Sequence, residues 1–331
     1  MSNDPARTCP DCDESLDRRR FLQSVGGVAA ACSAAPLLTN IASAAPTPKS
    51  AAETAVKALY ESMSDDQTKG VCLPFDHKLR TRIDANWRIT RARTSDQFLT
   101  SDQLDLVDQI LKGITSEDGY ERLKRQMQAD TKNGLADFSF AIFGEPGNGP
   151  SQFELTGRHL TLRADGDSVK GAAFGGPLVY GHGQGNPERN LFYYQTKQVN
   201  EVFKALDEKQ AQQALVADSP SEDEVELQGK EGKFPGIAVA DLSSDQKDLV
   251  TATLKTLLSP YREEDVDEVM HILKAGGGQD SLRMSYYADS DLKGDKVWDV
   301  WRIEGPSFVW HFRGDPHVHA YINIGLHDAQ A

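Results

Sequence analysis

The sequence predicts an α+β fold in which a mainly antiparallel sheet is flanked by amphipathic helices. Three observations indicate this class. Apolar residues recur at helical spacing in several segments, short strand-like runs lie between glycine and proline clusters, and helices precede strands in both halves of the chain. The 331 residues, 39% of them hydrophobic, are enough to bury a large core, so we expect an ordered domain rather than a disordered chain.

The first 44 residues have the features of an export signal. Arginines at 18–20 precede Phe-Leu at 21–22, and a mildly apolar run at 22–38 is followed by the small-residue site Ala-Ser-Ala at 42–44. Paired arginines before Phe-Leu predict the twin-arginine export machinery as a partner, and an ordinary secretory signal or a buried helix is the alternative. The apolar run is too weak to span a bilayer, so we expect no transmembrane anchor in the mature chain and a periplasmic or secreted location.

Cleavage after Ala44 would leave a linker at 45–50 and a single domain at 51–328. It would remove Cys9 and Cys12 together with Cys32, whose lipidation is a second-ranked alternative. Cys72 would then be the one remaining thiol, so the mature chain could form no internal disulfide. The leader holds five acidic and four basic residues, which leaves 45 acidic and 32 basic residues and a net charge of −13 in place of −14.

In the N-terminal half of the domain, apolar periodicity predicts a group of helices followed by a group of strands. The expected helices cover residues 52–63, 102–114 and 121–130, and the expected strands cover residues 138–143, 152–155 and 159–163. Glycine and proline clusters at 144–150 and 171–185 are expected to form loops.

The C-terminal half repeats this order. The expected helices cover residues 197–215, 244–259 and 263–275, and the expected strands cover residues 282–287, 296–304, 307–312 and 318–324. The acidic stretch at 219–232 is expected to be a solvated loop, because its charges repel one another. We expect Arg302 and Glu304 to pair on the surface, whereas most aromatic residues between Trp298 and Phe312 should fill the core.

One short repeat links the two halves. Residues 99–107, Leu-Thr-Ser-Asp-Gln-Leu-Asp-Leu-Val, match residues 242–250, Leu-Ser-Ser-Asp-Gln-Lys-Asp-Leu-Val, at seven of nine positions. A Ser or Thr three residues before Gln predicts a capping box at each helix start. A duplication of the two halves is one interpretation. A recurring way of starting a helix is the favoured one, because the similarity ends there.

Common catalytic motifs are missing from the sequence. It contains no Gly-x-Ser-x-Gly, no His-Glu-x-x-His and no P-loop, and the glycine-rich stretch at 181–185 lacks the spacing that binds a pyrophosphate. The excess of 50 acidic over 36 basic residues argues against nucleic acid as a partner, because nucleic-acid binding requires a basic surface.

Histidine placement is the strongest chemical signal. Four of the eight histidines lie in the last 21 residues, namely His311, His317, His319 and His327. His317 and His319 are two apart on an expected strand, so their side chains should share a face. His311 lies on the preceding strand and His159 begins an earlier one, and we take these four as candidate metal ligands, with His182 as a weaker fifth.

Imidazole ligands favour a transition metal such as Zn, Cu or Fe over Ca or Mg. Three protein ligands with an open position would make the site catalytic, and four would make it structural. The alternative is that His317 and His319 face solvent or form hydrogen bonds, with Asp315 as an acidic partner.

The mature chain resembles domain-of-unknown-function family 3500, a group of exported bacterial proteins, from about residue 51 to residue 325. The shared motifs are Gly119-Tyr120, Phe143-Gly144-x-Pro146, Gly157-x-His159-Leu160, Pro235-Gly236, Tyr286-Tyr287, Gly305-Pro306 and His317-x-His319. The resemblance implies no established activity, but it makes His159, His317 and His319 motif positions. The chain departs from the pattern at Arg158, where the family has His, and at His311, where an acidic residue is common.

Two functions follow as hypotheses. The first is an exported metalloprotein with hydrolase or redox activity, loaded with metal before folded export. The alternative is a non-catalytic binding or structural module of the cell envelope, with a small-molecule or envelope ligand. In that case the histidines should be dispersed rather than gathered in one place.

Overall fold

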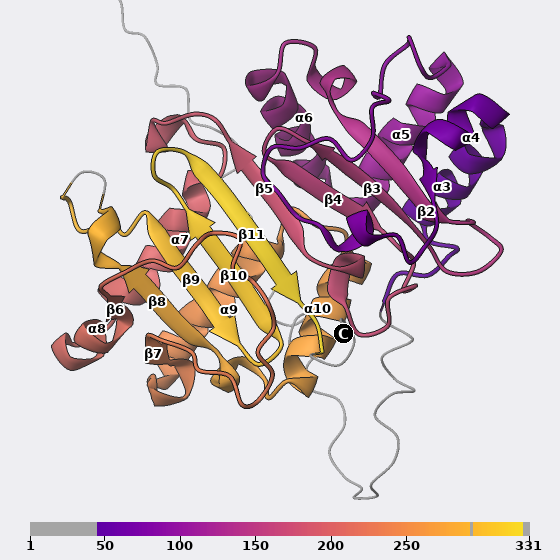
Figure 1. The fold of residues 1–331 in the computed structure, drawn as a ribbon. Coiled ribbons are helices and arrows are strands. Elements are labelled where there is room, and N and C mark those ends of the chain that lie inside the picture. The colour runs from indigo at the N-terminus through magenta and orange to yellow at the C-terminus, as the bar shows by residue number, and fades with distance from the viewer. Residues whose placement is uncertain (1–44, 292–293, 327–331) are drawn as a thin grey trace, which may run out of the picture. The chain divides into compact units, whose positions relative to one another are not determined.

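The computed structural model describes residues 45–291 and 294–326, which form an 11-stranded sheet with helices packed against one face (Figure 1). The expected export signal at 1–44 lies outside the described residues. Nearly all neighbouring strands are antiparallel, so the α+β class predicted from the sequence is confirmed. No helix in the described part of the chain is long and apolar enough to cross a membrane.

The N-terminal half runs from two helices and a short strand to two further helices and four strands. Its helices are α3 (Ala51–Ser62), α4 (Asp65–Val71), α5 (Ser101–Ile114) and α6 (Glu117–Asp130). Its strands are β1 (Cys72–Leu73), β2 (Ser139–Gly144), β3 (Ser151–Gly157), β4 (Leu160–Ala164) and β5 (Leu178–His182).

The C-terminal half has the same order of elements, with one extra two-residue strand, β7 (Ile237–Ala238). Its helices are α7 (Tyr193–Lys204), α8 (Glu208–Ala214), α9 (Ser244–Leu258) and α10 (Glu263–Ala275). Its other strands are β6 (Leu215–Val216), β8 (Arg283–Tyr287), β9 (Val300–Gly305), β10 (Phe308–Arg313) and β11 (Val318–Ile324).

The strand order shows that the two halves are structurally equivalent. From one edge to the other it is β1-β2-β3-β4-β5-β11-β10-β9-β8-β6, so the last strand of one half pairs with the last strand of the other at the centre. The first strand of each half, β1 or β6, pairs in parallel with β2 or β8. This arrangement supports the duplication that the short sequence repeat left open.

Hydrogen bonds repeat between the halves as well. Both predicted capping boxes form, at the starts of α5 and α9. In each, the capping glutamine also bonds the glutamine 36 residues before it, at 2.8 Å between Nε2 and Oε1: Gln67 with Gln103, and Gln210 with Gln246. The halves contact each other reciprocally, because Ser116 N–H donates to Pro260 O and Arg262 N–H donates to Ile114 O.

The helix-covered face of the sheet carries the main hydrophobic core. Along β9 and β10, the fully buried Trp301, Phe308, Trp310 and Phe312 alternate with residues on the opposite face, as the sequence predicts for core aromatics. Each such ring contributes about 2–3 kcal/mol by leaving water.

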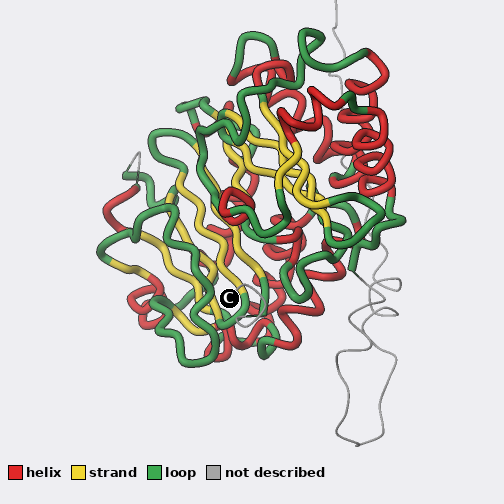
Figure 2. Tube along the Cα trace, turned by 45° about the vertical axis from the view of Figure 1, so that its right-hand side comes forward, coloured by secondary structure: helices red, strands yellow, loops and turns green. Residues whose placement is uncertain are grey.

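The opposite face of the sheet is covered by loops, which cross it in Figure 2. Val225, from the acidic segment at 219–232, is 2% exposed and packs with Ala85, Val179 and Val309. The expectation of a solvated loop is therefore wrong for this part of the segment, because burial of its apolar residues holds it against the sheet.

Three further expectations are wrong. The stretch at 171–185 was expected to be loop but contains β5, and the helix expected at 197–215 is two helices, α7 and α8. The expected helix is interrupted because a second helix starts after Asp207, which is the N-cap of α8 and forms a capping box with Gln210. Arg302 and Glu304 form an ion pair of 3.0 Å that is buried rather than on the surface.

Candidate metal centre

Three histidines converge at the central seam of the sheet, where the two halves meet. His159 lies in the turn between β3 and β4, His317 lies just before β11, and His319 lies within β11. One potential ligand atom from each lies within 4.8 Å of the others. These three of the four sequence-predicted ligands are therefore brought together; the presence of a metal stays a prediction.

Strand register explains this convergence. Leu160 pairs with Tyr180 between β4 and β5, and Tyr180 pairs with Ala320 between β5 and β11. The next residues along these three segments are His159, Gly181 and His319, so the two histidines lie on either side of Gly181. A Cβ on Gly181 would lie 2.3 Å from Val318 O and 3.2 Å from His159 Cβ, so only glycine leaves room for the two histidines there.

His159 has an unusual backbone. Its φ of 58° lies in the left-handed region, which histidine adopts more readily than most side chains, and its N–H donates to Ala85 O. The sequence placed His159 at the first position of a strand, but the strand begins at Leu160. The turn conformation directs the imidazole toward β11 instead of along the sheet.

The three imidazole rings form a nearly equilateral group. The ring centroids are 4.9 Å apart between His159 and His317, 4.9 Å between His159 and His319, and 4.8 Å between His317 and His319. The Nε2 atoms of His317 and His319 are 3.1 Å apart. Two facing Nε2 atoms at this distance are placed to share a proton or to bind one cation.

Two carboxylates orient the rings. Asp130 Oδ2, at the end of α6, lies 2.7 Å from Nδ1 of His159, and the Glu222 carboxylate lies 3.0 and 3.2 Å from Nδ1 of His319. A carboxylate that accepts from Nδ1–H leaves Nε2 unprotonated and free to coordinate. Protein metal sites commonly use this carboxylate–histidine arrangement.

Asp130 is itself held in place. It accepts hydrogen bonds from Gln126 Nε2 and from the Gly183 N–H, each at 2.8 Å. Burial alone would raise the pKa of Asp130, but the hydrogen bonds from His159, Gln126 and Gly183 lower it below its ordinary value. Asp130 is therefore ionised at neutral pH and can fix the tautomer of His159.

Glu222 belongs to the acidic segment. Burial raises the pKa of its carboxyl, but the hydrogen bond with His319 and the nearby Arg313 outweigh burial and lower it. Arg313 Nε lies 3.1 Å from Glu222 Oε2. Glu222 therefore links the acidic segment, which covers this face of the sheet, to His319.

The histidines are suited to metal binding at neutral pH. Burial, followed by the neighbouring His319 and His159, lowers the pKa of His317 to about 4. Burial also lowers the pKa of His319. Both rings are therefore neutral near pH 7, as a ligand must be.

The other two histidine candidates lie outside this group. His311 is 1% exposed on β10 and pairs with Tyr321, while Arg313 is the β10 residue opposite His319. Burial and Arg302 lower the pKa of His311 to about 3. His182, at the end of β5, accepts the Leu191 N–H at Nδ1.

The sequence did not identify Asp130 or Glu222. It named Asp315 as the acidic partner, but Asp315 is exposed. Asp130 ends a helix 29 residues before His159, and Glu222 lies 97 residues before His319. No spacing rule joins residues so distant, so only the fold reveals them.

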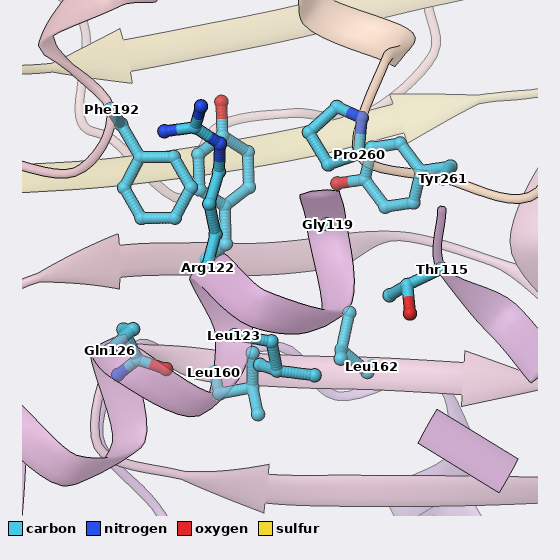
Figure 3. A pocket seen from close by; sticks show the side chains of 11 residues that line it. Thr115, Gly119, Arg122, Leu123, Gln126, Leu160, Leu162, Phe192, Pro260 and Tyr261 are labelled. Atoms are coloured by element: carbon cyan, nitrogen blue, oxygen red, sulfur yellow. The ribbon is translucent and has the colours of Figure 1, made fainter. Parts of the chain in front are cut away.

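A small pocket lies on the helix-covered face of the sheet (Figure 3). Its volume is about 40 Å³, and its walls include Leu123, Leu160, Phe192 and Tyr261. Gln126 lines it and links it to Asp130. This volume holds only a few water molecules, which is too little space for a substrate.

Comparisons with known proteins add one match. A search of curated proteins and a search of solved structures found no match to this chain. The model of the family described as "Protein of unknown function (DUF3500)" matches residues 45–324, which include His159, His317 and His319. Because that match covers most of the chain, the protein belongs to the DUF3500 family.

Proposed function

We propose that this protein is an extracytoplasmic metalloprotein in which His159, His317 and His319 bind one divalent transition-metal ion. The observation that carries the proposal is the convergence of three imidazoles, two of which have Nδ1 held by a carboxylate. A carboxylate bonded to Nδ1 makes the imidazole a more basic ligand and fixes its orientation. Histidine ligation favours zinc, copper or iron.

The number of ligands favours catalysis over a structural role. Three protein ligands leave a fourth tetrahedral position for water, whereas structural zinc sites are usually closed by four protein ligands. A divalent metal such as zinc lowers the pKa of its bound water to about 7. A hydrolytic reaction is the activity that this arrangement supports best, and redox chemistry would apply if the bound metal is copper or iron.

The location is part of the same proposal. The twin-arginine-like segment at 18–20 would direct export of the folded protein to the periplasm or beyond. Export after folding suits a metalloprotein because the metal can be inserted in the cytoplasm. A fusion of residues 1–50 to a reporter, compared with the same fusion carrying Arg18–Arg20 replaced by Lys, should show export only with the arginines intact.

Elemental analysis of the full chain, purified from the cytoplasm without a nickel column, tests metal binding. We expect about one transition metal per chain, with loss of most of it in His317→Ala and His319→Ala. The matched control is His271→Ala, because His271 is exposed on α10 and its Nδ1 contacts the backbone of its own helix. Wild type without metal after purification and after incubation with Zn²⁺ would contradict the proposal.

A non-catalytic envelope module remains the competing function, and the same preparation separates the two. In that case His317→Ala and His319→Ala should behave like His271→Ala in zinc content and in thermal stability. The close approach of the three imidazoles favours the metalloprotein, because dispersed histidines were the expectation for the alternative.

A further inference from the structure

Two arginines lie next to the histidine centre, although the protein carries a net charge of −14. Arg158 directly precedes His159 in the β3–β4 turn, and Arg313 stands opposite His319 on β10. Positive charge is therefore placed on both sides of the centre.

The first of these arginines, Arg158, is exposed. A Cβ on Gly183 would lie 2.8 Å from Asp130 Oδ1, 3.2 Å from His159 Cε1 and 3.7 Å from Arg158 Nη2, so the three groups surround one point. Among the described residues, Arg158 forms no ion pair.

The carboxylates near the centre do not neutralise its ligand side. Asp130 and Glu222 bind Nδ1 of His159 and His319, and Nδ1 lies on the ring edge away from Nε2. Both carboxylates are also engaged by further groups, Asp130 by Gln126 and Glu222 by Arg313. Each carboxylate is thus already bonded to an imidazole and to a second group.

The guanidinium of Arg313 has a nitrogen that makes no hydrogen bond to the described residues. Its Nε lies close to Glu222, but its Nη2 is buried and has no hydrogen-bond partner among the described residues. A buried guanidinium nitrogen without a partner can still donate a hydrogen bond to a ligand. Arg313 stands directly across from His319 in the sheet.

We propose that the histidine centre acts on an anionic substrate, whose carboxylate or phosphate group is bound by Arg158 and Arg313. This inference rests on the proposed metal site and names the class of its substrate. A guanidinium matches the geometry of both oxyanions and forms two parallel hydrogen bonds to them. The two arginines come from the turn that holds His159 and from the strand paired with His319, so they flank the centre.

The test measures oxyanion binding to the zinc-loaded protein by calorimetry, with inorganic phosphate in one arm and acetate in the other. We expect at least one of them to bind, and its dissociation constant to rise at least tenfold in Arg158→Gln and in Arg313→Gln. Arg158→Lys and Arg313→Lys should recover part of that loss. The arm with the tighter binding identifies the substrate as a phosphate or a carboxylate.

Arg283→Gln is the matched control. Arg283 lies on β8, three strands from β11 and roughly 14 Å away at the usual strand spacing, and it donates to a backbone carbonyl. Oxyanion affinity should not change in this variant. Arg158 is exposed, so Arg158→Gln keeps the test valid even if Arg313→Gln fails to fold.

Zinc content, measured on the same samples, separates the two proposals. A protein that binds zinc but binds phosphate and acetate equally well with and without these arginines would overturn the anionic-substrate inference and leave the metal site standing. A protein that binds no zinc would overturn both.

Discussion

The Nδ1 atoms of His159 and His319 are each held by a carboxylate, and this pairing controls how well the opposite nitrogen can bind a metal. For His159 the carboxylate is Asp130, at 2.7 Å. A carboxylate that bonds Nδ1 of a ligating histidine usually contributes 10–100-fold to metal affinity. The contribution arises because the negative charge stabilises the positive charge that the ligand gains on binding.

Asp130→Asn should therefore weaken zinc binding about 10–100-fold while the three histidines stay in place. Competition against a fluorescent zinc chelator measures this change. Asp118→Asn is the control, because Asp118 is exposed on the same helix and pairs only with Arg122 among the described residues. Equal zinc affinity in the two variants would show that Asp130 does not support a ligand.

Gly181 decides whether the histidines can approach each other. In Gly181→Ala the new methyl group would overlap Val318 O and press on His159 Cβ, at 2.3 and 3.2 Å. We expect a lower melting temperature and loss of stoichiometric zinc, since β5 and β11 must move apart. Gly70→Ala is the contrasting variant: its Cβ would meet only the Phe98 ring at 3.4 Å, and alanine favours a helix. A zinc-competent Gly181→Ala protein would exclude this role.

How far the histidine site could be predicted depends on register. The sequence predicts that His317 and His319 share a face, because they are two apart on a strand, and it adds His159 and His311 as further candidates. The structure brings His159, but not His311, to the other two. His311 also lies on the face that carries His319, but its partner on β11 is Tyr321, two residues beyond His319. The distance of His311 from the centre therefore depends on how β10 and β11 are aligned, and a single sequence does not specify that alignment.

At the scale of elements, helices were easier to predict than the strand that completes the site. The helix α10 begins and ends where its periodicity predicts. The strand β5 was missed because Leu178–His182 is short and lies between glycine-rich segments that indicate loops. Its identity as a strand comes from pairing on both sides, with β4 and β11, which is a tertiary effect.

The acidic segment acts as a cover for the outer face of the sheet near the centre. Val225 is buried there, and the backbone of Glu224 accepts a hydrogen bond from Arg302. Glu222 in the same segment bonds His319. Packing of the segment and orientation of a metal ligand are thus coupled through three neighbouring residues.

Val225→Asp should release the acidic segment, because an unpaired charge at a buried site is strongly unfavourable. We expect faster cleavage within 219–232 by a glutamate-specific protease, together with weaker zinc binding through the loss of Glu222. Val266→Asp on α10, which is only partly buried, provides the comparison. If cleavage accelerates but zinc affinity stays unchanged, Glu222 does not orient His319.

At the scale of the whole molecule, two equivalent halves contain one histidine centre. The β3–β4 turn, closed by the pair Gly157 and Leu160, corresponds to the β9–β10 turn, closed by Gly305 and Phe308. Ser307 therefore stands where His159 stands in the first half.

The position at the end of α10 that corresponds to Asp130 also lacks a carboxylate. Gly276 follows α10 as its C-cap, and a Cβ there would lie 2.1 Å from Ser307 Oγ. Gly276 and Ser307 thus lie close together, but neither carries a carboxylate or an imidazole. A common scaffold has kept its hydrogen bonds in both halves, whereas the histidine group takes His159 from the first half and His317 and His319 from the second.

Buried carboxyl groups on α10 give the molecule a pH-dependent stability. Burial, together with the nearby Asp165 and Asp265, raises the pKa of Glu268 to about 9. Burial likewise raises the pKa of Asp265 to about 7, although Arg262 opposes that rise. One oxygen of each carboxyl has no partner among the described residues. The folded protein therefore holds protons that the unfolded chain releases.

A raised pKa in the folded state means that stability falls as pH increases from about 4.5, the ordinary value of Glu268, toward about 9. Glu268→Gln cannot release this proton. The free energy of unfolding of the variant minus that of wild type should therefore increase by at least about 1 kcal/mol from pH 5 to pH 8. Urea unfolding of the metal-free proteins measures the difference. Glu264→Gln, exposed on the same helix, should follow wild type throughout. Parallel curves for Glu268→Gln and wild type would mean that Glu268 is already ionised in the folded protein.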